Sequence, residues 1–327
     1  MSDQVAGNRP DCAGKSRKSG LWVVLQLLGL ALAALTAAGF LGRWHWLFEL
    51  TSHFRCQYML MLAALALLLF TVKLRKSAAL AAICCLLNAA VVLPLFIPVQ
   101  TEEGRGEQVK VLFANVLVHN QDHQTVLRLI ADIDPDVIVL VETDRNWLRG
   151  LDELKAQYPH SLTEPYTGAF GIAMFSRLKT ASMEVVWVGE PAVPAILAKM
   201  EHGGRPMTLI GAHVFPPGSQ SRLAMRNSQM NDLATLAGDQ QSPCCLLGDL
   251  NTTPWSPYFR DLLHIGNLHD GRNGFGIQPS WPTGNWLLSI PIDHCLVQDG
   301  IQVKSRKIGP AIGSDHYPVI VDLVLQD

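Results

Sequence analysis

Residues 136–142 read DVIVLVE, in which five apolar, mostly β-branched residues follow an aspartate and end at Glu142. A short run of this kind is typical of a strand that is buried on both faces of a sheet. Just upstream, Gln124–Ala131 has helical apolar spacing and Pro135 follows it, while Val109–Val116 is another apolar run with strand character. This order of a strand, a helix and a buried strand predicts an α/β domain.

The same pattern continues to the end of the chain. Further strands are predicted at Gly171–Ser176, Ala195–Met200, Met207–His213, Cys244–Leu247, Ile292–Val297 and Val319–Leu325. Helices are predicted over Ser221–Leu236 and after Pro257. The 219 residues of 109–327 suffice for one sizeable core. Many strands with few helices between them favour a layered sheet sandwich flanked by helices.

The composition of the whole chain is unlike that of an ordinary soluble domain. Of 327 residues, 49% are hydrophobic and 17% are charged, against roughly a quarter charged in typical domains. This excludes a disordered chain, which would be poor in apolar residues. Seven cysteines in this length exclude a small disulfide scaffold.

The net charge of −2 conceals two unlike parts of the chain. Residues 1–99 carry nine Lys/Arg and three Asp/Glu, a balance of +6, whereas the rest carries seventeen and twenty-five, a balance of −8. The basic part also contains three runs without charge, which are Leu21–Gly42, Cys56–Val72 and Ser77–Thr101. The 22 residues of the first run would form a helix of about 33 Å, enough to cross a bilayer.

Two other interpretations of these runs are weaker. A cleaved signal peptide has an apolar region of about 7–15 residues, shorter than the first run, and no charged mature segment follows here. Buried core helices are disfavoured because three long uncharged runs lie within 100 residues. Pro94 and Pro98 near the end of the third run predict a kinked or ending helix.

The basic residues predict an orientation in the membrane. Lys and Arg gather before the first run and in the KLRK loop of residues 73–76, which the positive-inside rule assigns to the cytoplasm. Three crossings then leave the α/β domain outside, in the periplasm if the membrane is a bacterial inner membrane. We therefore expect a cytoplasmic tail (1–20), three transmembrane helices within 21–101 (about 21–42, 56–72 and 77–99), a short linker (102–108) and the domain (109–327).

Polar residues recur where the predicted strands end, which is where side chains from distant parts of a sheet protein converge. They are Asn115, Glu142, His213, Asp249, Asn251, Asp293, His294, Asp315 and His316. Taken singly, each is an ordinary turn or core residue. Together, the Asp, Glu and Asn oxygens suit Mg²⁺ or Mn²⁺, and aspartates beside histidines suit proton transfer.

Other site chemistries have no support in the sequence. It has no Cys/His spacing for zinc, no G-x-S-x-G motif for a serine nucleophile and no Walker loop. A metal with carboxylates and imidazoles fits the hydrolysis of a phosphate ester.

The motifs stand in a recognisable order: N…PDVIVLVE…GIAMFSR…GAHVFP…GDLNTTP…IDHCLV…SDHYPV. In this order they resemble the endonuclease/exonuclease/phosphatase (DNase I-like) superfamily over nearly all of 109–327. The resemblance implies a four-layer α/β/β/α sandwich and Mg²⁺-dependent cleavage of phosphoester bonds.

The resemblance also implies roles for residues at the matching positions. Glu142 is then the principal metal ligand with Asn115 beside it, and Asp315 is a second acidic residue near the metal. Asp249 orients or deprotonates the attacking water, and Asn251 helps to hold the phosphate. The identity of the general base and the number of metals stay open.

Three further residues complete the set that the resemblance implies. His316 contacts the phosphate, and Asp293 is hydrogen-bonded behind it and fixes its tautomer. His213 stabilises the transition state or protonates the leaving oxygen. For His294 a structural role is favoured, because many family members carry an aromatic or aliphatic residue there.

Two departures from the family pattern bear on the substrate. Exonuclease III-like repair enzymes usually carry a Lys two residues after the metal-binding Glu, where this chain has Asp144, and commonly a Tyr where it has His213. The −8 balance and the lack of a Lys/Arg-rich stripe also disfavour tight nonspecific DNA binding. Candidate substrates are a lipid head group, a nucleotide or a nucleic acid.

Two functions of different classes are compatible with the sequence. The leading hypothesis is a membrane-anchored, metal-dependent phosphodiesterase or phosphatase that faces the outer side. The alternative is a non-catalytic membrane-tethered binding or scaffold module that keeps the same fold.

The cysteines of the α/β domain are predicted to be core residues. They are Cys244, Cys245 and Cys295, and a disulfide bond from Cys295 to one of the other two is left open.

Overall fold

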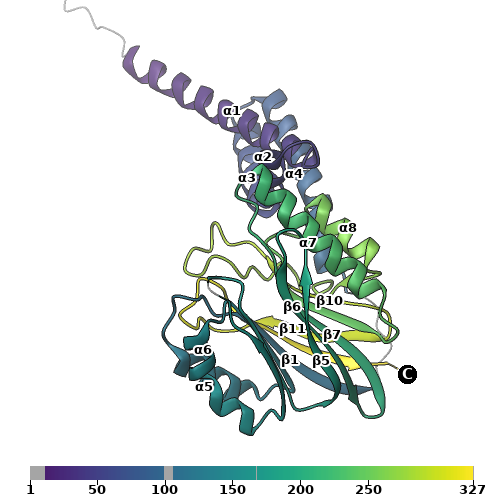
Figure 1. Cartoon of the computed structure of the whole chain (residues 1–327). Coiled ribbons are helices and arrows are strands. Elements are labelled where there is room, and N and C mark those ends of the chain that lie inside the picture. Colours follow the sequence, from purple (N-terminus) through teal and green to yellow (C-terminus); the bar gives the residue numbers. More distant parts are fainter. Residues whose placement is uncertain (1–11, 99–105, 167, 327) are drawn as a thin grey trace, which may run out of the picture.

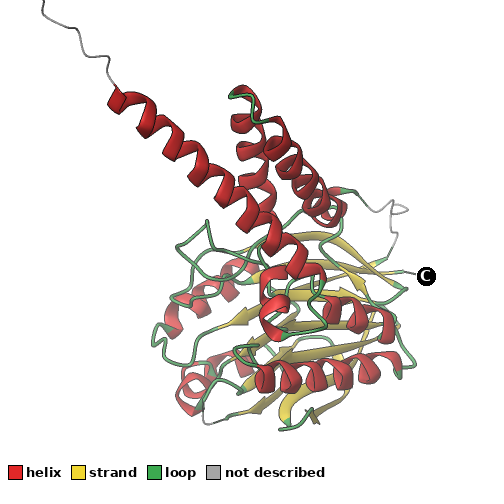
Figure 2. Ribbon diagram, turned by 90° about the horizontal axis from the view of Figure 1, so that it is seen from above, coloured by secondary structure: helices red, strands yellow, loops and turns green. Residues whose placement is uncertain are grey.

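The computed structural model describes residues 12–98, 106–166 and 168–326, and side chains from Gly20 onward. It contains two six-stranded sheets that pack face to face, with helices on their outer faces and a group of N-terminal helices that projects beyond the sheets (Figures 1 and 2). The predicted four-layer α/β/β/α sandwich is thus confirmed.

The first sheet has the strand order β11-β12-β1-β2-β4-β3. Its strands are β1 (Glu107–Asn115), β2 (Val137–Val141), β3 (His160–Glu164), β4 (Ile172–Ser176), β11 (Ile301–Ile308) and β12 (Val319–Leu325). Strands β1 and β2 are parallel, whereas β12, β4, β3 and β11 pair antiparallel with their neighbours. All five residues of β2 are buried, as the DVIVLVE run predicts for a strand that is covered on both faces.

The second sheet has the strand order β5-β6-β7-β8-β10-β9. Its strands are β5 (Lys179–Val188), β6 (Val193–His202), β7 (Arg205–His213), β8 (Cys244–Asp249), β9 (His269–Asp270) and β10 (Asp293–Val297). The parallel pair here is β7 and β8. Cys245 and Cys295 lie close together in this sheet, with their sulfurs 3.7 Å apart, and both thiols are free.

Three apolar layers hold the sandwich together. Between the sheets, Val111 packs in one cluster with Leu209. The next residue of β1, Leu112, points the opposite way and packs with Trp147 below the helices α5 (His123–Ile133) and α6 (Arg145–Gly150) and the 3₁₀ helix η2 (Asp152–Ala156). Helices α7 (Gln220–Gly238) and α8 (Pro257–Ile265) cover the second sheet, where Phe259 is buried.

The N-terminal helices are α1 (Cys12–Phe40), α2 (Trp46–Ser52), α3 (Arg55–Thr71) and α4 (Arg75–Val92), followed by the 3₁₀ helix η1 (Leu93–Phe96). Gly20–Phe40 and Arg75–Phe96 are long and apolar enough to cross a membrane. Helix α3 meets the same criterion only together with α2, from which it is bent by 66°. The described residues therefore contain two spanning candidates, or three if the bent pair counts as one span.

These helices pack directly against the α/β domain. Val92 and Leu95 form an apolar cluster with Trp255, which lies between β8 and α8. The backbone N–H groups of Gly274 and Gly276 both donate to the Leu95 carbonyl at 2.9 Å. Most of the predicted 102–108 linker lies outside the described residues, and β1 already begins at Glu107.

A buried ion pair links the two parts of the chain. Glu49 in α2 and Arg226 in α7 are both fully buried, and Nη2 of Arg226 donates a hydrogen bond to Oε1 of Glu49 at 3.0 Å. The hydroxyl of Ser256 donates to the same oxygen at 2.9 Å. A second ion pair between the two parts, Arg43 with Asp261, is largely exposed.

We expect the two pairs to differ sharply in their effect on stability. Arg226→Met removes the arginine from the buried Glu49 carboxylate, whose other oxygen lies 3.3 Å from the imidazole of His53, and should lower the free energy of unfolding by about 3–5 kcal/mol. Arg43→Met breaks only a solvated pair and should cost less than about 1 kcal/mol. Thermal unfolding of the full-length chain in detergent measures both.

A double variant provides the matched control for this comparison. Because Glu49→Leu with Arg226→Met removes both charges, it should recover a large part of the loss in Arg226→Met. Equal destabilisation by the single and double variants would show that side-chain packing, rather than the buried charge, holds this junction together.

Candidate functional site

Three of the predicted site residues stand in one row across the second sheet. Strand β7 ends at His213, β8 ends at Asp249 and β10 begins at Asp293. In the register of the sheet, His213 is the Cα partner of Asp249, and Asp249 is the Cα partner of Asp293. Because the sheet itself sets this row, an imidazole and two carboxylates are brought side by side without help from a loop.

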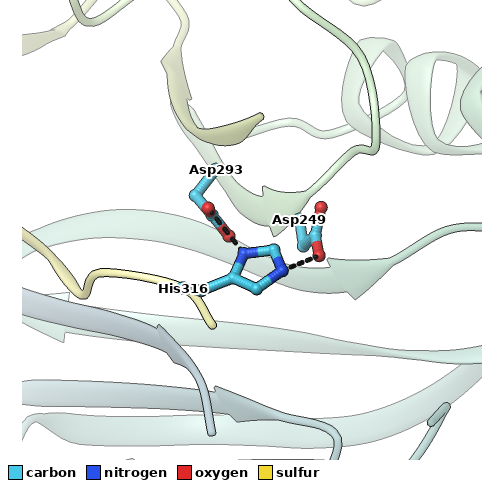
Figure 3. Close-up of side chains that lie close together, drawn as sticks. All are labelled: Asp249, Asp293 and His316. Atoms are coloured by element: carbon cyan, nitrogen blue, oxygen red, sulfur yellow. Dashed lines mark hydrogen bonds and ion pairs between the residues drawn. The ribbon is translucent and has the colours of Figure 1, made fainter. Parts of the chain in front are cut away.

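His316 approaches the row from the segment that precedes β12. Its Nδ1 donates to Asp293 Oδ2 at 2.9 Å, and its Nε2 lies 3.6 Å from Asp249 Oδ2. Figure 3 shows the imidazole lying between the two carboxylates. All three side chains are almost fully buried. The predicted hydrogen bond between Asp293 and His316 is present in this arrangement.

Burial and neighbouring charges shift the protonation of this group. Burial by itself lowers the pKa of His316, but the charges of Asp293 and Asp249 and the hydrogen bond to Asp293 outweigh it and raise the pKa to about 10. Burial raises the pKa of Asp249 to about 6 against the opposing charge of His316. At neutral pH the group therefore holds an imidazolium cation next to ionised Asp249.

His213 lies on the other side of Asp249. Its Nδ1 donates to the carbonyl of Ala169 at 2.9 Å, and its Nε2 lies 3.5 Å from Asp249 Oδ2. The ring also packs against Phe170, with the centroids 5.2 Å apart. The loop before β4 thus orients this imidazole, and Nε2 is the nitrogen that faces the site.

The first sheet contributes Asn115 and Glu142 to the same place. Asn115 is the last residue of β1, and its Nδ2 donates to Glu142 Oε1 at 2.9 Å and to Asp249 Oδ2 at 3.1 Å. Its Oδ1 accepts from the backbone N–H of Leu117 at 3.0 Å. Asn115 therefore bridges carboxylates of both sheets with its amide nitrogen, and binding of a metal through Oδ1 would require its amide to turn.

Two site residues have left-handed backbone conformations. Glu142 has φ 61° and Asn251 has φ 46°. This region is uncommon for residues other than glycine and persists only where the surroundings hold it, often at functional sites. Asn251 is held through its backbone N–H, which donates to Asp249 Oδ1 at 3.1 Å, and through Nδ2, which donates to the Val214 carbonyl at 2.9 Å.

The donor set fits a divalent metal. Asp249, Asp293 and His316 each offer a ligand atom within 4.8 Å of the others, so this group could hold an ion. Among the described residues, Asp293 Oδ1 is buried without a hydrogen-bond partner, and such an oxygen is suited to bind a cation. His316, however, has Nδ1 bonded to Asp293 and is protonated at neutral pH, which favours the oxygens of Glu142 and the aspartates as ligands.

Asp315 is bonded to a different segment from the other predicted ligands. Its Oδ2 accepts from Trp281 Nε1 at 3.0 Å, and its backbone carbonyl accepts from Thr283 at 2.9 Å. Within the described residues, its hydrogen bonds run to the loop at 281–283 and not to Asn115 or Glu142. Its Oδ1 is buried and has no hydrogen-bond partner in the part of the chain that the structure describes. Its metal role remains a prediction.

His294 faces away from this row into a buried polar group. Its Nε2 donates to the Thr252 carbonyl at 2.9 Å, and its Nδ1 accepts from Arg272. Burial and the charge of Arg272 lower its pKa well below the usual value, so the ring is neutral. It therefore supports the loop after Asn251 from behind.

Arg226 also supports this loop, and its role was not predicted from the sequence. Its Nη1 donates to the backbone carbonyl of Asn251 at 3.2 Å, and its Nη2 pairs with Glu49. The only sequence signal is an arginine that interrupts the apolar spacing of Leu223 and Met230 in the predicted helix. His53 of the N-terminal helices contacts the same loop, with Nδ1 3.0 Å from Thr253 Oγ1.

Comparison with known sequences gives one extended match. A profile of the Endonuclease/Exonuclease/phosphatase family matches residues 112–316, which include every predicted site residue. A UPF0294 protein of Vibrio parahaemolyticus is 27% identical over 130 residues, or 38% of this chain. The match spans 42% of the length of that curated relative.

Solved structures share the fold at low sequence identity. An endonuclease/exonuclease/phosphatase from Bacteroides vulgatus is 17% identical, with a TM-score of 0.58 over 67% of this chain and 100% of that one. TDP2 of D. rerio, complexed with a single-strand DNA product, is 13% identical, with a TM-score of 0.58 over 66% and 99%. The human Nocturnin catalytic domain with a bound sulfate anion is 18% identical, with a TM-score of 0.54 over 68% and 96%.

The raised pKa of His316 predicts how stability depends on pH. The folded chain keeps the His316 proton up to a pH of about 10, whereas an unfolded chain loses it near 6.5. This contribution to stability is therefore fully present below pH 6.5 and is lost as the pH rises toward 10. In EDTA, the unfolding temperature of the full-length chain should fall between pH 7 and 9.

His316→Gln is the matched control, because it keeps a polar side chain without the titrating group. The variant should be less stable at pH 7 and should show a flatter pH dependence than the wild type between pH 7 and 9. If the two slopes are the same, His316 does not carry the proton assigned to it.

Proposed function

Because the chain belongs to the endonuclease/exonuclease/phosphatase family, we propose that it is a membrane-anchored, Mg²⁺-dependent phosphoester hydrolase. The observation that carries the proposal is the meeting of Asn115 and Glu142 from one sheet with His213, Asp249 and Asp293 from the other. A non-catalytic module would gain nothing from holding several buried charged groups at one point, because their desolvation is costly.

Glu142 and the neighbouring aspartates would hold the metal, with Mg²⁺ favoured and Mn²⁺ suited to the same oxygens. When bound, the ion would neutralise charge that develops on the phosphoryl oxygens. Asn115 would remain beside it and keep Glu142 and Asp249 at a fixed separation.

The protonation states suggest distinct tasks for the other residues. Asp249, ionised above a pH of about 6, is suited to orient or deprotonate the attacking water. The His316 cation, kept in place by Asp293, is suited to contact the phosphate and stabilise its developing charge. Asn251 would help to hold the phosphate, and His213 would protonate the leaving oxygen or stabilise the transition state.

The membrane assignment rests on the apolar helices and the basic flanks. The Glu49–Arg226 pair supports α2 as a junction helix, because a fully buried carboxylate bound to α7 belongs at the domain and not in hydrocarbon. The 17 residues of α3 would then form the second crossing alone, with a length of about 25 Å. With the N-terminus in the cytoplasm, three crossings leave the catalytic domain on the periplasmic face of an inner membrane.

Hydrolysis by the full-length chain in detergent tests the catalytic proposal. With Mg²⁺ the chain should cleave an aryl phosphodiester or monoester, and EDTA should abolish the activity. Glu142→Gln should lower kcat/KM by about 100-fold or more, because the main charged ligand is lost. Glu184→Gln, an exposed substitution on the edge strand β5, is the matched control and should leave the rate unchanged.

The alternative, a membrane-tethered scaffold, makes the opposite prediction for metal binding. Isothermal titration of the full-length chain with Mg²⁺ should give a signal that Glu142→Gln weakens. Absence of both binding and EDTA-sensitive hydrolysis, in protein that unfolds cooperatively, would favour the scaffold. Full activity in Glu142→Gln would overturn the assignment of this ligand.

Labelling of single introduced cysteines tests the orientation. Lys199 on β6 and Lys76 at the start of α4 are both exposed. In intact spheroplasts, an impermeant maleimide should label Lys199→Cys and should label Lys76→Cys only after permeabilisation, because the KLRK loop lies inside. The reverse pattern would contradict the orientation but not the hydrolase assignment.

A further inference from the structure

A loop beside the candidate site exposes three consecutive apolar side chains at its tip. In the loop of residues 282–289, Trp286 is 81% exposed, Leu287 58% and Leu288 52%. Single exposed apolar residues are ordinary, but a contiguous group marks a surface that contacts an apolar partner. We call residues 282–289 the apolar loop.

The base of the apolar loop is fastened to the segment that carries His316. Thr283 donates through its backbone N–H to the Asp315 carbonyl at 2.9 Å and through its hydroxyl to the Ser314 carbonyl at 3.0 Å. The backbone N–H of Gly284 lies 3.4 Å from the hydroxyl of Tyr317. The exposed tip therefore extends from a base that is held at the edge of the site.

The other end of the apolar loop is fastened to the N-terminal helices. Gln57, in the first turn of α3, donates from Nε2 to the Ser289 carbonyl at 3.1 Å. One turn further along α3, Leu60 is 60% exposed and Met61 45% exposed. Figure 1 shows the loop, in yellow-green, on the side of the α/β domain that faces the helices. One end of the loop is thus held within one turn of the exposed apolar residues of α3.

A groove lies along the apolar loop. Its volume is about 390 Å³, and it is lined by Pro279, Pro282, Gly284, Trp286, Ser289 and Tyr317. Tyr317 directly follows His316, and Trp286 belongs to the exposed tip. The groove therefore extends from the exposed tip to the segment that carries His316.

We propose that Trp286–Leu288 inserts into the surface of the bilayer that holds α1, α3 and α4, and that the substrate is a phosphoester in the head group of a membrane lipid. The inference rests on the proposed function for its catalytic part. A bilayer is the occupant that fits, because α3 holds the loop at Ser289, next to the exposed tip, and itself exposes Leu60 and Met61 one turn further along. An aromatic side chain beside two leucines suits the boundary between head groups and acyl chains.

Fluorescence quenching by brominated lipids tests the insertion without using catalysis. The full-length chain is placed in nanodiscs of phosphatidylcholine brominated near the head-group end of its acyl chains, and emission is compared with that of Trp286→Phe. The emission assigned to Trp286 should fall by about half or more relative to unbrominated discs, because an inserted ring lies about 5–10 Å deep.

Two other tryptophans serve as controls for this measurement. Trp44, 77% exposed just after α1, should be quenched because a tryptophan at the end of a membrane-spanning helix lies at the membrane–water interface. Trp187, 51% exposed on β5, should not be quenched. Quenching of Trp44 without quenching of Trp286 overturns the insertion and leaves the membrane anchor intact. If neither Trp44 nor Trp286 is quenched, the result contradicts the membrane assignment itself.

The substrate class is tested by two leucines that do not line the groove. Leu287→Ser with Leu288→Ser should lower hydrolysis of phospholipid in the discs by about tenfold, because two apolar side chains leave the bilayer. Hydrolysis of a water-soluble aryl phosphoester should change by less than about twofold. If the double variant loses hydrolysis equally on both substrates, or loses none on phospholipid, the lipid assignment is overturned. If the wild-type chain hydrolyses neither substrate, the result contradicts the hydrolase proposal instead.

Discussion

The pairing of β7, β8 and β10 is the constraint on which the rest of the site depends. It makes His213, Asp249 and Asp293 neighbours in one row of the sheet, so their separation is fixed by backbone hydrogen bonds. A shift of one residue in any of these strands would turn a site residue to the opposite face. The apolar core between the sheets specifies that register, because the same shift would expose its buried side chains. The stability of the fold and the geometry of the site therefore have one physical origin.

The sequence predicts the inner strands of both sheets but does not predict the edge strands. Strands β11 and β3 end the first sheet, and β5 and β9 end the second; none of these four was predicted. Inner strands are covered on both faces and show continuous apolar runs, as in β2. In β5 most residues stay exposed or half-buried, and β9 has only two residues, so neither leaves an apolar signal. Helices α5, α7 and α8 lie where they were predicted, whereas the short helices α2 and α6 were not predicted.

Most of the candidate site was predictable because its residues directly follow or begin apolar strands. Asn115, Glu142, His213, Asp249 and Asp293 come together as expected, although their roles remain proposals. What the sequence could not reveal is the second layer of contacts, since an arginine in α7 and a glutamate in α2 lie 177 positions apart. Their pairing depends on how the N-terminal helices dock on the domain, and no local pattern encodes that. The hydrogen bond between Asp315 and Trp281 also joins residues far apart in the sequence, 34 positions, and no local pattern predicts it.

The buried pair of Glu49 and Arg226 also imposes an order of assembly on the nascent chain. Glu49 leaves the ribosome long before Arg226 is made, and its carboxylate must stay hydrated until α7 docks, because burying it alone is costly. Helix α2 therefore cannot complete its packing before α7 has formed, although it is synthesised early. The helical part and the α/β domain are in consequence not exchangeable modules. A helical anchor taken from another protein would leave a buried arginine without a counter-charge, so the two parts can change in evolution only together.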